Sequence, residues 1–466
     1  MKVALISPPT DSAITRVLGT TGPPLGLAYL AAAIRDEHDV RIIDSTAEGL
    51  DKADLERVLK REDPDIVGIS ATTSMIPDAY ETAEIAKRLN ENVKVVLGGP
   101  HATFLPERTM RECPYVDFVV RGEGEETFRE LVSAVEKGRD LRAIRGVSFK
   151  ENGRTVNNPP RGLVNNLDDL PIPAYDLLPM ERYSLDGVQF GAVITSRGCP
   201  FNCAFCSSSR QFGGTWRGHS PERVLEELRI LRDEFGKREI EFLDDTFTLS
   251  KRRAIEISDA IRREGLDISW TASSRVDTFS REVAESMRRG RATTVYFGIE
   301  SASERILDFI GKRITPEKSA AAVRCSKRAG LSVVGSFVIG FPDETPEEVR
   351  KTVDFSRRLD LDLAQFTIAT PYPGTRLWDY AERRSLFLTW DWRKFTTLDP
   401  VMRLKNFTSS QISRIMRFAY LRFYLRPKFI IRDLVRRKGV ILRKAISYLK
   451  SFLVRGPGEG PPGRAE

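Results

Sequence analysis

The chain has 466 residues, of which 41% are hydrophobic and 30% charged, and it carries a net charge of +8. This length exceeds one ordinary hydrophobic core, so we expect two or three domains, and the composition is typical of a globular protein rather than a disordered or membrane-spanning one. No secretory signal and no apolar stretch long enough to cross a bilayer is visible. Five cysteines do not form a disulfide framework, which favours the reducing cytoplasm.

The first part of the chain alternates short apolar strands with helices. This alternation predicts a parallel sheet covered on both faces, and we expect an α/β domain of the Rossmann-like (flavodoxin-like) type over residues 1–140. The expected strands are Lys2–Ser7, Val40–Asp44, Asp65–Ser70, Val93–Gly98 and Phe118–Arg121, and expected helices include Leu27–Arg35, Pro77–Leu89 and Glu125–Lys137.

Small and hydroxylated residues follow the third, fourth and fifth of these strands, in the loops Ser70–Ser74, Gly98–Thr103 and Arg121–Glu125. Ligands of parallel sheets bind outside the carboxyl ends of the strands, where helix N-termini favour anions. Taken alone this signal is weak, because Gly, Ser and Thr are also ordinary turn residues.

Residues 141–185 are expected to form a linker, because the segments Asn157–Gly162 and Leu170–Tyr175 are rich in proline. A second series of strands and helices over residues 186–395 predicts a partial (β/α)6 barrel, with its chemistry at the carboxyl ends of the strands. The expected strands are Gly191–Thr195, Glu239–Leu243, Ser269–Ala272, Thr294–Ile299, Val333–Ile339 and Leu363–Ile368.

The most specific motif follows the first strand of the second series. Cys199, Cys203 and Cys206 form a CxxxCxxC pattern opened by Gly198 and Pro200. Three thiolates at this spacing can hold one iron–sulfur cluster and leave one iron without a protein ligand. A structural zinc site is the alternative, but it normally uses paired CxxC motifs or a distant pair of histidines, which are absent.

With this motif after a Rossmann-like domain, the chain resembles the cobalamin-binding subfamily of the radical S-adenosylmethionine (SAM) enzymes, including an aromatic residue, Phe205, before the third cysteine. The resemblance implies a [4Fe–4S] cluster on the three cysteines, SAM on the open iron, and cobalamin on the N-terminal loops. The cofactors would carry the chemistry, through a 5′-deoxyadenosyl radical. It also implies an electron donor such as ferredoxin or flavodoxin.

The resemblance places the cobalamin tail against the three N-terminal loops. The DxHxxG motif that supplies a cobalt-ligating histidine in other cobalamin proteins is absent, so we expect no protein ligand to cobalt and interpret His101 as a loop residue that forms hydrogen bonds. The residues expected to contact cobalamin are Ser70, Thr72, Thr73, Gly98, Gly99, His101, Gly122 and Glu123.

Polar residues follow successive strands of the expected barrel. Each one alone fits a helix cap or a turn, but their recurrence predicts a shared cavity. The resemblance implies that the segment after the second strand binds the amino group of SAM and that the guanidinium group of an arginine binds its carboxylate. It also implies that further residues contact the ribose, methionine and adenine parts of SAM. These expected SAM contacts are Phe205, Asp244, Asp245, Arg275, Glu300 and Gly340.

The basic character belongs to residues 396–466, where we expect helices and a disordered tail. Between Arg422 and Arg455 there are eleven Lys and Arg and one acid, Asp433. The excess of positive charge in this segment is larger than the net charge of the whole chain. Apolar residues at helical spacing accompany them. This segment could lie on an anionic membrane or pack on the barrel; it could also bind nucleic acid, although no nucleic-acid module accompanies it.

We therefore predict a cobalamin-dependent radical SAM enzyme that methylates an unactivated carbon. The alternatives are a radical cyclase or ring-rearranging enzyme and, from another class, a non-catalytic cobalamin sensor, against which the intact cysteine trio argues. Methylthiolation is disfavoured because a second N-terminal cysteine triad is absent. The basic tail suggests a lipid or isoprenoid substrate, while a tetrapyrrole, peptide or antibiotic precursor fits the barrel equally well.

Overall fold

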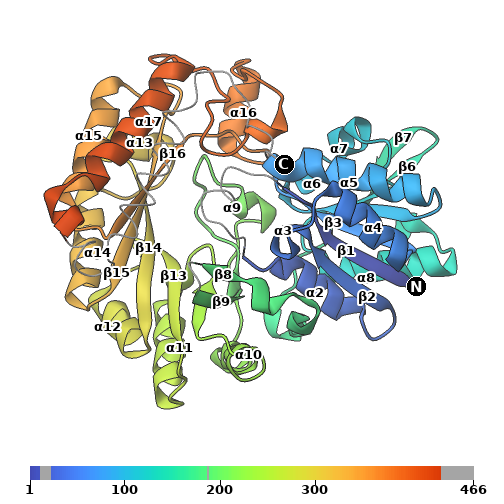
Figure 1. Cartoon of the computed structure of the whole chain (residues 1–466). Helices are drawn as coiled ribbons and strands as arrows, with labels where there is room; N and C mark the ends of the chain where they lie inside the picture. The colour runs from blue at the N-terminus through green and yellow to red at the C-terminus, as the bar shows by residue number, and fades with distance from the viewer. Residues whose placement is uncertain (11–21, 186–187, 432–466) are drawn as a thin grey trace.

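The structure is a computed structural model that describes residues 1–10, 22–185 and 188–431. It contains two seven-stranded sheets, each flanked by helices, and the two units lie side by side (Figure 1).

The first sheet has the strand order β2-β1-β3-β4-β5-β6-β7, in which β1 to β5 are parallel. Alternate residues of each strand enter two separate hydrophobic cores, one under α2 and α8 and one under α4 and α5, as expected for a sheet covered on both faces. The strands are β1 Lys2–Ser7, β2 Asp39–Asp44, β3 Ile66–Ser70, β4 Lys94–Gly98 and β5 Phe118–Val120; the helices are α2 Leu25–Ile34, α3 Ser45–Glu48, α4 Lys52–Glu62, α5 Ile76–Leu89, α6 Pro100–Phe104, α7 Pro106–Glu112 and α8 Glu125–Lys137.

An antiparallel hairpin extends this sheet into the range 141–185 that the sequence analysis assigns to a linker. It consists of β6 Val147–Glu151 and β7 Arg154–Asn157, and β6 pairs with β5. Asn152 and Gly153 both have positive φ, as a two-residue hairpin turn of the Asn-Gly type requires. The Asn-Gly dipeptide is the sequence signal for this hairpin. Only the proline-rich part after the hairpin connects the two sheets.

The second sheet has the order β16-β15-β14-β13-β12-β9-β8, and its six strands from β9 to β16 are parallel, as predicted for a partial barrel. Helices α10 to α15 cover its outer side (Figure 1). The strands are β8 Ser184–Leu185, β9 Val188–Val193, β12 Glu239–Phe242, β13 Ser269–Arg275, β14 Ala292–Glu300, β15 Ser332–Ile339 and β16 Leu363–Ile368; the helices are α10 Pro221–Asp233, α11 Lys251–Arg263, α12 Arg281–Arg289, α13 Glu304–Phe309, α14 Pro316–Arg328 and α15 Pro346–Arg358.

The segment after β16 returns to the first unit. It contains α16 Arg376–Arg383 and a short 3₁₀ turn, η7 Trp392–Lys394. Trp378, Trp392 and Phe395 are buried in the same hydrophobic core as α4 and α5, so the C-terminal part of the barrel completes the core of the N-terminal unit. The two units therefore share buried surface.

The last described helix, α17 Ser409–Tyr424, packs on the barrel. Its buried residues Ile412, Met416, Ala419 and Phe423 follow the helical period. Residues 432–466, with most of the predicted basic segment, lie outside the described residues. Within the described ranges no helix combines the length and the hydrophobicity needed to cross a bilayer.

Candidate active site

The three cysteines lie on a loop between β10 Ser196–Arg197 and α9 Ser208–Gln211, and all three line one cavity of about 320 Å³. Gly198 opens the loop with φ +87, and a Cβ there would collide with the carbonyl oxygen of Thr215, so only glycine lets the chain turn here. Cys206 donates its backbone N–H to the carbonyl of Cys203 at 3.2 Å.

These thiols fit an iron–sulfur cluster. They are free, and they face a common cavity. Within the described ranges no set of three or more Cys, His, Asp or Glu surrounds a position for a single metal ion. A cluster does not need such convergence, because it is held by separate thiolates on separate irons.

Asp244 and Asp245, adjacent in the sequence, take different positions. Asp244 is fully buried and accepts hydrogen bonds from the backbone N–H and hydroxyl groups of Thr195 and Ser196 at 2.6–3.1 Å. It does not line the cavity. Its carboxylate, just after β12, holds the segment after β9 that leads to the cysteines, and its contact with SAM stays a prediction. Asp245 lines the cavity and accepts from the Ser208 hydroxyl at 2.5 Å.

Arg275 reaches the cavity from the end of β13. Its Nε and Nη2 donate to the carboxylate of Asp277 at 2.9 and 2.8 Å, and Nη1 lies 3.8 Å from the Cys203 sulfur. The guanidinium also stacks 3.6 Å from the centre of the Phe201 ring. Because Nε and Nη2 already donate to Asp277, Arg275 is held against the cysteine loop, and these two nitrogens are not available to a ligand carboxylate.

Glu300 forms a buried ion pair with Lys312 at 2.8 Å, and both residues line the same cavity. Glu300 has φ +63, at an irregularity where β14 leaves β15. A Cβ on Gly298 would lie 2.7 Å from the Lys312 Nζ and collide with the Glu300 carboxylate, so glycine makes room for the pair. Lys312 was not predicted from the sequence, because it comes from the turn after α13 and has no motif.

Phe205 also lines the cavity, whereas Gly340 does not. Gly340 has φ +82, donates its N–H to the Glu344 carboxylate at 2.6 Å, and faces Ile412 of α17. Gly340 therefore forms a turn that packs against the C-terminal helix, and its contact with SAM stays a prediction. Burial raises the pKa of Glu344 to about 8.

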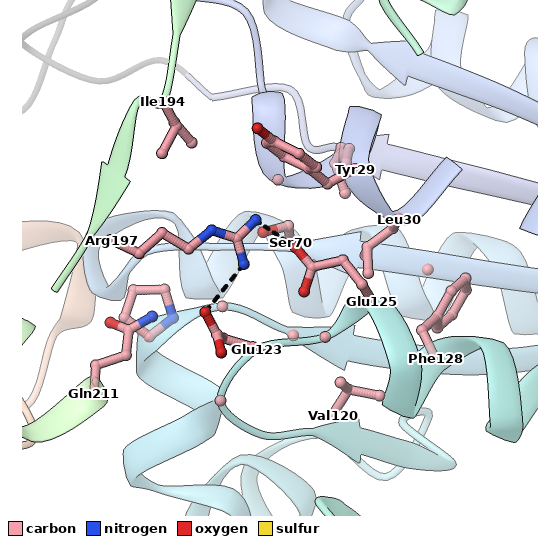
Figure 2. A pocket seen from close by; sticks show the side chains of 18 of the residues that line it. Tyr29, Leu30, Ser70, Val120, Glu123, Glu125, Phe128, Ile194, Arg197 and Gln211 are labelled. Atoms are coloured by element: carbon pink, nitrogen blue, oxygen red, sulfur yellow. Dashed lines mark hydrogen bonds and ion pairs between the residues drawn. The ribbon is translucent and has the colours of Figure 1, made fainter. Parts of the chain in front are cut away.

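A second cavity, of about 350 Å³, lies between the first sheet and the barrel. Figure 2 shows its walls: Ser70 is the last residue of β3, Glu123 comes from the loop after β5, and Ile194 and Gln211 come from the barrel side. Gly99 brings two of the loops together, since a Cβ there would lie 2.5 Å from the carbonyl oxygen of Ala71.

Arg197 crosses this cavity from the barrel to the first unit (Figure 2). Its guanidinium donates to Glu123 at 3.1 Å and to Glu125 at 2.6 Å, and all three side chains are at most 9% exposed. Glu123 also pairs with Arg217. Burial alone would raise the pKa of Glu123, but the hydrogen bond from Arg217 and the charge of Arg197 lower it below its usual value.

Two polar atoms of this cavity have no hydrogen-bond partner among the described residues: the hydroxyl of Tyr29 and the second carboxylate oxygen of Glu125. Buried polar groups are normally paired. A ligand with amide and hydroxyl groups, such as cobalamin, would satisfy them, so the cavity fits the cofactor that the sequence predicts. The sequence analysis did not predict that Arg197 and Tyr29 line this cavity. The position of Arg197, two residues before the first cysteine, was the sequence feature that could have indicated it.

The predicted cobalamin contacts fall into two groups. Five of the eight line this cavity: Ser70, Gly98, Gly99, Gly122 and Glu123. Thr72, Thr73 and His101 do not line it, and their contacts with cobalamin stay predictions.

His101 is buried edge-to-face against Trp392, with ring centres 4.7 Å apart, and neither of its nitrogens has a hydrogen-bond partner within the described part of the chain. It is a packing residue rather than a loop residue that forms hydrogen bonds, and burial lowers its pKa to about 4. The α6 turn directs it toward η7 and away from the cavity.

Asp245 lines both cavities, so the cavity that carries the cysteines and the cavity over the first sheet are neighbours that share this residue as a wall.

Comparison with known proteins agrees with this arrangement. A family model described as B12 binding domain matches residues 12–132, and one described as Radical SAM superfamily matches residues 193–356. An uncharacterized methyltransferase of Pyrococcus horikoshii is 65% identical over 449 residues, covering 96% of this chain and 98% of the relative.

More distant relatives include an anaerobic magnesium-protoporphyrin IX monomethyl ester cyclase of Rubrivivax gelatinosus, 28% identical over 98% of this chain and 83% of its own length. A hopanoid C-3 methylase of Methylococcus capsulatus is 30% identical over 80% of this chain and 71% of its own. Among solved structures, the cobalamin-dependent SAM radical enzyme OxsB, determined with aqua-cobalamin and SAM bound, superposes with a TM-score of 0.76 at 20% identity, covering 97% of this chain and 71% of OxsB. At this identity the likeness concerns the fold.

Proposed function

The chain belongs to the cobalamin-dependent radical SAM methyltransferase family, and we propose that it transfers a methyl group to an unactivated carbon of a small-molecule substrate. The observation that carries the proposal is that Asp245 lines both the cysteine cavity and the cavity over the first sheet, which makes the two cavities neighbours. A substrate bound beside Asp245 would lie near both cofactors, as hydrogen abstraction and methyl delivery at one carbon require.

The residues that line the two cavities would hold the cofactors. Cys199, Cys203 and Cys206 would bind the cluster, and the Glu300–Lys312 pair and Asp245 would offer polar partners to SAM. The loops after β3, β4 and β5 would bind cobalamin, with Tyr29 and Glu125 as further partners. When bound, the cluster and SAM supply hydrogen abstraction and cobalamin supplies the methyl group. The protein positions these groups and excludes water.

The proposal is tested first on cofactor chemistry, which needs no substrate. The anaerobically reconstituted protein should cleave SAM to 5′-deoxyadenosine and should transfer a deuterated methyl group from SAM to bound cobalamin. Cys203→Ala should abolish SAM cleavage, whereas Cys325→Ala, a thiol outside the motif, should leave it intact. Retained cleavage in Cys203→Ala would contradict the assignment.

Cyclisation is the second candidate, favoured by the likeness to the anaerobic cyclase along 98% of the chain. Extracts of a strain that lacks the gene distinguish the two reactions by mass. Methyl transfer predicts that the missing compound exceeds an accumulated precursor by one CH₂ unit. Cyclisation predicts a change in hydrogen or oxygen content without added carbon.

We further propose that the substrate is lipid-like and that the C-terminal region brings the enzyme to an anionic membrane. The support in the described part is a set of apolar side chains on α17 and just after it, Phe418, Leu425 and Ile431, which are 51–62% exposed next to Arg422 and Lys428. Exposed apolar and basic residues together favour an anionic bilayer surface.

Co-sedimentation with vesicles of phosphatidylcholine and phosphatidylserine tests this. The full chain should bind at low salt and be released by salt, because the attraction is screened. A chain ending at residue 431 with Phe418→Ser and Leu425→Ser should bind more weakly. Failure of the full chain to bind at low salt refutes membrane docking but leaves methyl transfer standing.

A further inference from the structure

We propose that the surface hollow between α9, α13 and α16 is the docking site for an acidic one-electron carrier protein of the flavodoxin or ferredoxin class, which reduces the cluster through the cysteine loop. This inference rests on the proposed cluster at the three cysteines. Its experiment separates failure of the docking site from failure of the cluster.

The hollow reaches the back of the cysteine loop. Its floor includes Ala204, the residue between Cys203 and Phe205. Ala204 is held by backbone hydrogen bonds on both sides, donating to Ile310 and accepting from Leu377 at 2.8 Å each. One peptide unit thus separates the floor of the hollow from a cluster ligand, and this wall is fixed to α13 and α16.

Arginines dominate the lining. Arg210, Arg376 and Arg383 line the hollow with one acid, Asp379, and Arg384 lies over the neighbouring ring of Tyr380 at 4.0 Å. Asp379 pairs with Arg210 at 2.7 Å, yet the Arg210 side chain stays 40% exposed. Three arginines and one acid leave the lining itself with more positive than negative charge, and one further carboxylate, that of Asp343, accepts a hydrogen bond from the Tyr380 hydroxyl beside it. The excess of positive charge is complementary to an acidic partner.

Arg376 connects the basic lining of the hollow with the cysteine loop. Its Nη2 donates to the carbonyl of Ile310 at 3.3 Å, and its Nε has no partner among the described residues. At Gly311, a Cβ would lie 2.9 Å from the Arg376 Nη2 and 3.2 Å from the carbonyl oxygen of Asn202 in the cysteine loop. The glycine therefore lets the guanidinium approach the cysteine loop.

A packed row of aromatic rings joins the hollow to the cluster cavity. Tyr380 and Phe309 line or border the hollow with centres 5.8 Å apart; Phe341 follows at 6.2 Å and Phe205, which lines the cavity, at 6.3 Å. Aromatic side chains therefore connect the hollow with the cluster cavity. One electron would leave the carrier and enter the cluster, with no transfer of a proton or a group.

The test uses the reconstituted full chain and a purified, reduced flavodoxin of net negative charge. The double variant Arg210→Glu/Arg383→Glu should be reduced at least tenfold more slowly at low salt, since electrostatic steering of on-rates spans about 10–10³-fold. The matched control is Arg252→Glu/Arg281→Glu, which makes the same charge change at side chains 88% and 86% exposed on α11 and α12.

Two further measurements make the outcome decisive. Dithionite, a small reductant, should reduce the cluster equally fast in all three proteins, and binding of oxidised flavodoxin, which needs no cluster, should weaken only in the Arg210/Arg383 variant. Equal rates and equal binding in both double variants would overturn the docking site. A protein that dithionite cannot reduce but that still binds flavodoxin at this hollow would instead refute the cluster and leave the docking site in place.

Discussion

Buried charges at the two cavities are paired with one another. Glu300 and Lys312 are 6–7% exposed on their side chains, and Arg197 with its two carboxylates is similarly enclosed. Removing one partner of such a pair leaves an unpaired buried charge, which costs far more than the pair itself contributes. The consequence can be measured one residue at a time.

Lys312→Met should destabilise the protein by about 3–5 kcal/mol, because the Glu300 carboxylate then stays buried without its partner. The double variant Glu300→Gln/Lys312→Met should recover part of that loss. Thermal unfolding of the cofactor-free protein, analysed as a double-mutant cycle, gives the coupling. Lys428→Met, which breaks an exposed pair with Asp360, should cost at most about 1 kcal/mol; a double variant as unstable as Lys312→Met would contradict the pairing argument.

His101 should make the fold sensitive to acid. Its pKa is lowered by burial from 6.5 to about 4, so unfolding takes up a proton between these values and stability falls as pH drops from 6.5 toward 4. His101→Phe keeps the ring against Trp392 but cannot titrate. The melting temperature of His101→Phe relative to wild type should therefore rise as the pH is lowered from 6.5 toward 4.

The spectrum of bound cobalamin checks the same variant independently. Because His101 lies outside the cavity, the cobalt ligand-field bands of His101→Phe should match those of wild type. A shifted spectrum would mean that this histidine reaches the cobalt.

At the scale of elements, the cysteine loop depends on backbone geometry as much as on its thiols. The loop runs between β10 and α9, and β10 pairs with β11 Arg217–Gly218 on its far side. Gly198 and Gly214 within this region both have positive φ, but only Gly198 is crowded by neighbouring backbone. The two glycines form a matched pair for mutation.

Gly198→Ala should lower the iron content of the reconstituted protein several-fold, since the new Cβ collides with the carbonyl oxygen of Thr215. Gly214→Ala meets nothing within 4 Å and should cost only the left-handed backbone strain, about 1–2 kcal/mol, with iron content preserved. Iron analysis together with circular dichroism separates loss of the site from loss of the fold. Equal iron content in both variants would argue against a crowded turn at Gly198.

In the whole molecule, two of the contacts between the sheet unit and the barrel differ in chemistry. One is the Arg197 network across the cavity between the first sheet and the barrel, and the other is the aromatic segment around Trp392, whose ring nitrogen donates to Glu112 at 2.9 Å. The Trp392 contact buries apolar area, whereas the Arg197 network is polar and lines the cavity itself. We therefore expect the Arg197 network to couple cofactor binding to the arrangement of the two units.

Arg197→Met should weaken cobalamin binding at least tenfold and lower the unfolding free energy by about 3–5 kcal/mol, because Glu125 loses its buried partner. Adding Glu125→Gln should restore part of the stability. Arg229→Met, at an exposed pair with Glu264 on the barrel surface, serves as the control and should leave binding unchanged. Titration of the apoprotein with cobalamin provides the affinity, and equal affinity in Arg197→Met would refute the coupling.

The sequence by itself determined the features that depend on neighbours along the chain. Alternating apolar strands and helices predicted both α/β units, and the CxxxCxxC spacing predicted the cluster loop, because periodicity and ligand spacing are local properties. The loops after β3 to β5 were located in the same way, and five of their eight named residues line the cavity. The Asn152-Gly153 turn could also be predicted from the sequence, although it lies within the predicted linker.

Which polar side chains face the cavities follows from tertiary packing. Asp244 and Asp245 are neighbours, yet Asp244 accepts hydrogen bonds from Thr195 and Ser196, whereas Asp245 lines both cavities. Lys312 lies 12 residues after Glu300 and Arg197 lies 74 residues after Glu123, and no motif links the partners of either pair. Such pairings depend on how separate elements pack, and in a buried site a charge must find a partner in space rather than along the sequence.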